Sequence, residues 1–368
     1  MAKTPRTKNG YKMSDISSML QKAIRRNDVP NAAYATRELY FGFRPMIWNR
    51  LLTISAEDCF GIVTREIVAL NQADSILNGK DSGEESCLTF IAKAITFLCA
   101  ARKNRDAIYV ASNYLWLNQK LSEDELLTFT GHSKTFGPAD TKNGYTADDM
   151  LTMLHSSTCQ SDIPHAAYAV QELYSRFKKQ MWNLLLATSD EDCHGVMTEE
   201  VMALRSTDNK VNGKKSATHA NLMFVAKAII LLSMARKNPN ANYISCNSLC
   251  MDSAMSNVEF LASIDSSSVE NLMRSDFRFQ IPDYVFDVYT YRGKKNGKTR
   301  LDFLIDENKA LNPHQPGLFD NGNYREYYDR CRRIKYPIKP ESDLRWQQFM
   351  ERGEADPTHN GKDFPEFH

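Results

Sequence analysis

Residues 32–40 read AAYATRELY, and residues 166–174 read AAYAVQELY. The identical strings KNGY at 8–11 and 142–145 lie at the same separation of 134 residues. The same ungapped separation aligns three further segments: Trp48-Asn49 with Trp182-Asn183, Asn78-Gly79-Lys80 with Asn212-Gly213-Lys214, and Ala101–Asn104 with Ala235–Asn238. This constant register predicts an internal duplication. Because solenoid repeats are only roughly 20–50 residues long, we expect each copy to form a domain.

Both copies have the sequence pattern of helices. In the first copy, the apolar residues of 16–24 recur at helical spacing, and Pro30 and Gly42 mark the start and end of a second helix. The fold class that we expect is all-α, with two clamp-loader-collar-like helical domains in tandem and a C-terminal extension packed on them. The predicted boundaries are 1–130 for the first domain, 131–146 for a linker, 147–252 for the second domain, and 253–368 for a C-terminal helix and extended tail.

The composition is that of an ordinary globular protein. Hydrophobic residues make up 42% of the 368 residues, and 46 Lys and Arg balance 45 Asp and Glu, so any attraction to nucleic acid has to be local. The basic N-terminus has no apolar stretch behind it, and no run of 18 apolar residues occurs. We therefore expect a cytoplasmic protein with no membrane association. The eight scattered cysteines agree with a reducing compartment.

A short motif occurs in both copies, as SAEDCFG at 55–61 and SDEDCHG at 189–195. A serine followed three residues later by a carboxylate is typical of a capping box at a helix N-terminus, so we expect a structural role. A catalytic carboxylate pair is the less favoured alternative, because neighbours on a helix point about 100° apart. A metal site at Cys193-His194 is weaker still, since the first copy has Phe60 in place of the histidine.

The same residues resemble the C-terminal helical region of replication-associated recombination protein A, a clamp-loader-type AAA+ ATPase family of bacteria. The resemblance covers about 1–118 and 135–252. It implies a collar fold, self-association that is tetrameric in the family, and association with the replication fork. It rests on these residues: Ile24-Arg25-Arg26, Ala32-Ala33-Tyr34, Arg50-Leu51, Ser55, Glu57-Asp58, Gly61 and Arg102-Lys103-Asn104.

The ATPase module of that family has no counterpart in the sequence. The nearest candidate for a phosphate-binding loop is GKKNGKT at 293–299, whose glycines are one residue too close for a P-loop. It also lacks a βαβ context. We therefore predict an exposed basic loop here, no cofactor and no ATP binding.

The C-terminal third is rich in aromatic residues and has two local basic clusters. Arginines beside exposed aromatic rings are typical of single-stranded nucleic-acid binding, in which cations contact phosphates and rings stack on bases. The favoured alternative is that the tail wraps the helical domains with its rings buried and its charges paired. The candidate nucleic-acid-binding residues are Arg292, Lys294, Lys295, Lys298, Arg300, Arg330, Arg332, Arg333 and Lys335.

Three classes of function remain open. We favour a non-catalytic oligomerisation or scaffold protein of DNA replication, recombination or repair, encoded by a phage or mobile element, with a homodimer as its assembly and DNA or a replication protein as partner. The second class is a single-stranded nucleic-acid-binding protein that uses the tail. The third is an enzyme with a site between the repeats, for which the candidate residues are Glu57, Asp58, Glu191, Asp192, His194 and Tyr289.

Overall fold

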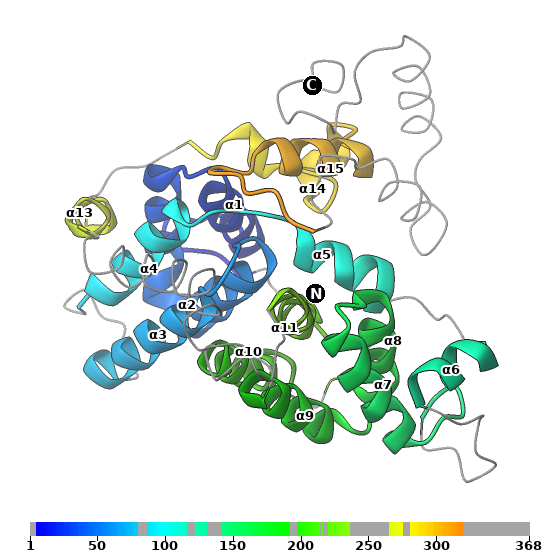
Figure 1. Ribbon diagram of the computed structural model, residues 1–368. Helices are drawn as coiled ribbons and strands as arrows, with labels where there is room; N and C mark the ends of the chain where they lie inside the picture. Colours follow the sequence, from blue (N-terminus) through cyan, green and yellow to red (C-terminus); the bar gives the residue numbers. More distant parts are fainter. Residues whose placement is uncertain are drawn as a thin grey trace. The chain divides into compact units, whose positions relative to one another are not determined.

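A computed structural model confirms that the protein is all-α (Figure 1). The structure describes residues 5–79, 87–115, 122–130, 141–191, 197–213, 215, 220–235, 265–274 and 280–318. Within these ranges the extended backbone forms only isolated bridges, and no strand occurs. None of the described helices combines the length and apolar character that a bilayer-spanning helix needs.

The chain divides into two compact units. Unit 1 comprises residues 1–60, 66–105 and 261–368, and unit 2 comprises 61–65 and 106–260. Residues 106–130, which the sequence assigned to the first domain, therefore belong to unit 2, and the C-terminal region belongs to unit 1. Thr141 and Tyr145, in the second half of the predicted linker, are buried in a turn of unit 2.

Unit 1 contains the N-terminal helices and all the C-terminal helices that the structure describes. Helix α3, Thr64–Asn78, begins in unit 2 and continues into unit 1. The other elements are α1 (Met13–Arg25), α2 (Val29–Glu57), α4 (Thr89–Ala100), α13 (Ser267–Arg274), the 3₁₀ helix η2 (Asp283–Val285), α14 (Tyr291–Lys295) and α15 (Arg300–Lys309).

The described part of unit 2 contains α5 to α11. These elements are α5 (Asp106–Val110), the π-helix η1 (Ala111–Leu115), α6 (Glu123–Thr130), α7 (Ala147–Cys159), α8 (Ile163–Leu173), α9 (Lys178–Glu191), α10 (Thr198–Asn212) and α11 (Met223–Met234).

Local sequence explains where the second helix of each copy begins. The carboxylate of Asp28 accepts a hydrogen bond from the Asn31 amide at the start of α2, and Asp162 does the same for the His165 amide at the start of α8. A proline follows each capping residue by two positions, where the missing N–H costs nothing. Helix α2 is kinked at Phe43, so the predicted end near Gly42 corresponds to a bend in one long helix.

The apolar face predicted for α1 forms part of the core. Ile16, Met19, Leu20 and Ile24 are all 0% exposed, and α1 packs mainly on α2. In unit 2, α11 is buried along almost its whole length. Packing of these faces, rather than helix propensity alone, stabilises helices of this length.

A buried aspartate joins three helical segments of unit 1. The carboxylate of Asp74 on α3 is 0% exposed and accepts hydrogen bonds from Trp48 Nε1 (2.7 Å), Arg44 Nε (2.8 Å) and Tyr40 Oη (3.1 Å) of α2. Asn78 donates to the same carboxylate and exchanges two hydrogen bonds with the backbone of residue 87. The charge is therefore fully compensated in the interior.

Unit 2 repeats this arrangement at positions 134 residues later. Asp208 is 0% exposed and accepts from Tyr174 Oη (2.6 Å), Trp182 Nε1 (3.0 Å) and Lys178 Nζ (2.7 Å). Asn212 again donates to the aspartate and exchanges two hydrogen bonds with the backbone nine residues further on. The separation read from the sequence therefore relates the same side-chain network in both units.

We expect Asp74→Ala to lower the free energy of unfolding by about 3–5 kcal/mol, because Arg44 and three neutral donors would lose their buried partner. Asp208→Ala should have a similar effect in unit 2. Urea titrations followed by circular dichroism measure both, with exposed Asp148→Ala as control. A loss below about 1 kcal/mol in both buried variants would contradict a supporting role for the network.

Candidate functional site

The predicted capping box at residues 55–58 is wrong. Ser55 lies in the last turn of α2, and its hydroxyl donates to the carbonyl oxygen of Leu52 (2.8 Å) instead of accepting from an amide. Ser189 behaves in the same way toward Leu186 (2.7 Å). The serine–carboxylate spacing thus marks the end of a helix in this protein, not its beginning.

Asp58 is instead the centre of a buried ion cluster in unit 1. Its carboxylate is 0% exposed and accepts from Arg25 Nε (3.1 Å) and NH2 (3.0 Å) in a bidentate contact. Arg105 NH1 (2.8 Å) and Gln21 Nε2 (3.1 Å) complete its partners. An aspartate enclosed in this way cannot contact a substrate, so we assign Asp58 a structural role.

Two carboxylates of the C-terminal region extend the cluster. Glu307 of α15 forms ion pairs with Arg25, Arg26 (3.4 Å) and Lys22 (3.7 Å), and Lys22 Nζ also contacts Asp287 (2.6 Å). The side chains of Arg25, Lys22 and Glu307 are each no more than 3% exposed. The C-terminal region is therefore held against α1 by buried charge pairs, as the wrapping alternative anticipated.

The cluster shifts the pKa values of its acids in opposite directions. Burial raises the pKa of Glu57, and the neighbouring Asp58 charge adds to that effect. Burial also opposes ionisation of Asp58 and Glu307, but the charge of Arg25 and of the other cations outweighs it, and the pKa of each falls below its usual range. Asp58 and Glu307 are therefore held ionised by their partners.

The low pKa of Glu307 makes unfolding dependent on pH. Its contribution to stability is present above the unfolded pKa of about 4.3 and is lost as pH falls through the lower folded value. We expect Glu307→Gln to be less stable than wild type at pH 7, with the difference shrinking toward pH 3. Urea midpoints measure it, with Glu199→Gln, at a 74% exposed side chain, as control. A difference that stays constant from pH 7 to pH 3 would contradict the assignment.

The other residues of the enzyme hypothesis are not brought together in the described structure. Tyr289 is 56% exposed and packs edge-on against Phe303 (5.0 Å between ring centroids). Asp192, His194 and the side chain of Glu191 lie outside the described residues. Among the described residues no group of three or more His, Cys, Asp or Glu side chains is placed to hold a metal ion.

Three of the predicted nucleic-acid-binding residues lie together on the short helix α14. Arg292 has a side chain that is 58% exposed, and Lys294 and Lys295 are also exposed. The side chain of Arg300 is not described, and Arg330, Arg332, Arg333 and Lys335 lie outside the described residues.

Exposed tyrosine rings accompany these cations. Tyr291 is 73% exposed and Tyr289 is 56% exposed, whereas Phe286 is buried under the guanidinium of Arg292 (4.3 Å to the ring centroid). The half-buried Lys12 places its Nζ 5.1 Å from the ring centroid of Tyr291. Lys12 was not a predicted site residue, although the basic N-terminus was visible in the sequence. We use the name α14 surface for Lys12 together with the exposed residues Tyr289, Tyr291, Arg292, Lys294 and Lys295.

Helix α14 is fixed by a close backbone approach. A Cβ atom at Gly293 would lie 1.9 Å from the carbonyl oxygen of Asp287, so only glycine fits there. The hydroxyl of Thr290 caps the helix by accepting from the Gly293 amide (3.1 Å). The backbone that carries the exposed cations is therefore well defined.

The GKKNGKT segment forms a helix, a turn and a helix start. Thr299 and Asp302 form a reciprocal capping box at the start of α15, and Lys298 Nζ contacts Asp306 (3.2 Å). The threonine and lysine that would bind phosphate and magnesium in a P-loop are thus used within the helix–turn–helix. No strand precedes the segment within the described residues.

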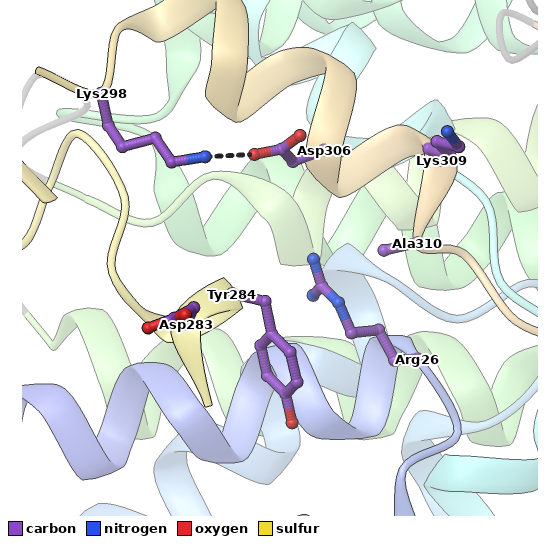
Figure 2. Close-up of a pocket in the computed structure, with 7 residues that line it drawn as sticks. All are labelled: Arg26, Asp283, Tyr284, Lys298, Asp306, Lys309 and Ala310. Carbon is purple, nitrogen blue, oxygen red and sulfur yellow. Dashed lines mark hydrogen bonds and ion pairs between the residues drawn. The ribbon is translucent and has the colours of Figure 1, made fainter. Parts of the chain in front are cut away.

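A cavity of about 370 Å³ lies beside the α14 surface in unit 1 (Figure 2). Its lining includes three cationic side chains, from the C-terminal end of α1, the turn before α15 and the end of α15. The lining residues are Arg26, Asp283, Tyr284, Lys298, Asp306, Lys309 and Ala310. Arg292 of the α14 surface contacts Asp283 (3.9 Å), so the surface and the cavity share an edge.

Comparison with known proteins identifies no relative: no family model, no curated protein and no solved structure matches this chain. The resemblance to the collar of a clamp-loader-type ATPase therefore stays a prediction.

Proposed function

We propose that this protein is a non-catalytic binding protein that holds single-stranded nucleic acid on the α14 surface. The observation that carries the proposal is the alternation of exposed cations and exposed tyrosine rings in one short segment. From the sequence alone a scaffold function ranked higher. The exposure of Tyr289 and Tyr291 favours the nucleic-acid alternative, because buried rings were the expectation for a tail that only wraps a core.

The two kinds of side chain have complementary roles in such a surface. Lys294, Lys295 and Arg292 supply positive charge to the phosphate backbone, and their contribution is local because the whole chain carries a net charge of only +1. A tyrosine ring offers a face on which any base can stack, worth roughly 1–3 kcal/mol per base. Single strands are favoured over duplexes because their bases are open to stacking.

We expect the triple variant Arg292→Ala/Lys294→Ala/Lys295→Ala to weaken binding of a 12-nucleotide single strand at least tenfold at about 50 mM salt. The slope of log Kd against log salt should fall by about 2, because each neutralised phosphate of a single strand contributes roughly 0.7 to it and three cations are removed. Fluorescence anisotropy measures both quantities.

The matched control removes three exposed lysines of unit 2, Lys142, Lys179 and Lys215, and so changes the net charge equally. Equal affinity of wild type and the α14 triple variant would reject the proposal, as would an equal loss of affinity in the control. Tyr291→Ala should weaken binding without changing the salt slope, since stacking releases no counterions.

Self-association is a second candidate function, favoured by two exposed apolar side chains on α3. Ile76 is 84% exposed and Leu77 is 60% exposed, although most large apolar side chains of the described residues are buried. We infer a tandem duplication from the repeated Asp74 and Asp208 networks, and a duplicated collar-like domain could build a homodimeric scaffold in DNA replication, recombination or repair.

We expect light scattering at micromolar concentration to give twice the 42.0 kDa of one chain, and Ile76→Lys/Leu77→Lys to restore one chain mass. A mass of one chain that does not change on concentration would reject the homodimer. The same variant should leave single-strand binding at the α14 surface unchanged if the two functions are separate.

A further inference from the structure

We propose that the cavity beside the α14 surface binds one phosphorylated nucleotide, the terminal nucleotide of a strand held on that surface. This inference rests on the proposed nucleic-acid function and names the part of the ligand that the cavity takes. It is carried by the arrangement of charged side chains around the cavity and by its continuity with the α14 surface.

The cations of the cavity are held in place by neighbouring groups. The guanidinium of Arg26 lies 4.4 Å from the ring centroid of Tyr284, and its terminal nitrogens contact the carbonyl oxygen of Lys22 (3.2 Å) and Glu307 (3.4 Å). A guanidinium carries five N–H donors, so these contacts leave donors for a ligand. The hydroxyl of Tyr284 donates to Asp28 (2.9 Å), which fixes the ring that orients Arg26.

The opposite side of the cavity is formed by α15 and the turn before it. Figure 2 shows the Lys298–Asp306 pair across the cavity from Tyr284 and Arg26, with Lys309 further along α15. A phosphate placed among Arg26, Lys298 and Lys309 would receive charge-assisted hydrogen bonds from two chain segments that are far apart in the sequence.

The two carboxylates argue for a nucleotide rather than a bare phosphate. Asp283 and Asp306 would repel a free anion, but their oxygens can accept hydrogen bonds from a sugar hydroxyl or an exocyclic amino group. Small-molecule pockets span about 300–1,000 Å³. The 370 Å³ of this cavity therefore suits a single nucleotide unit and is small for a dinucleotide.

Continuity with the α14 surface argues for a strand end. Asp283 contacts both the cavity and Arg292, and Lys298 follows Lys295 by three residues. A strand whose phosphates contact α14 can therefore place its last nucleotide in the cavity. An internal nucleotide would need to leave the cavity on a second side.

The experiment compares three 12-nucleotide single strands that carry a 5′-phosphate, a 3′-phosphate or hydroxyl groups at both ends. We expect one phosphorylated strand to bind about tenfold more tightly than the strand with hydroxyl ends, because charge-assisted hydrogen bonds are added. In Lys309→Ala this preference should fall below about threefold, while the affinity for the hydroxyl-ended strand stays within twofold of wild type. Lys179→Ala, which removes an exposed lysine of unit 2, should keep the full preference.

Equal affinity for all three strands overturns the inference and leaves the proposed function standing, and so does a preference that survives Lys309→Ala. If none of the strands binds, the proposed function fails, and calorimetry tests the cavity by itself. A nucleoside monophosphate that binds more tightly than inorganic phosphate and the nucleoside, with binding abolished in Lys309→Ala, supports the nucleotide site. Equal or absent binding of the three overturns it.

Discussion

The arrangement of unit 1 depends on the burial of one guanidinium. Arg25 is 2% exposed, and a buried cation without partners would cost several kcal/mol. It is compensated by Asp58 at the end of α2 and by Glu307 on α15. Because these two carboxylates come from opposite parts of the chain, a single side chain fixes both the turn after α2 and the C-terminal helices. The places of α14 and of the cavity follow from that constraint.

The same constraint explains why the two units differ although one side-chain network is common to both. Asp74 and Asp208 have matching tyrosine, tryptophan and asparagine partners, so each unit retains the same internal scaffold. The position 134 residues after Arg25 is Cys159, which carries no positive charge at neutral pH. Unit 2 therefore lacks the cation that pairs with the C-terminal carboxylates, and the C-terminal segments that the structure describes belong to unit 1.

The sequence predicted the features that depend on local order and missed those that depend on distant partners. The spacing of Ile16 to Ile24 was sufficient for α1, and the constant separation of 134 residues matched the paired networks. The Ser55–Asp58 spacing misled because a helix end with an ion-paired carboxylate has the same letters as a helix start. Lys12 and Arg26 were not assigned to the candidate site, since their neighbours Tyr291 and Tyr284 follow hundreds of residues later. The cluster on α14 was found because its cations are adjacent in the chain.

The discontinuous composition of unit 1 also affects its synthesis on the ribosome. Glu307 is translated 282 residues after Arg25, which at typical bacterial and eukaryotic rates takes roughly 15–60 s. Unit 2 lies between these two residues, so its helices can pack while unit 1 still lacks its C-terminal helices. During that interval Lys22, Arg25 and Arg26 are without the carboxylates of α15 and of the segment after η2. The nascent chain therefore presents a basic helix end that the finished protein covers, and truncated chains released early would keep it open to cellular polyanions.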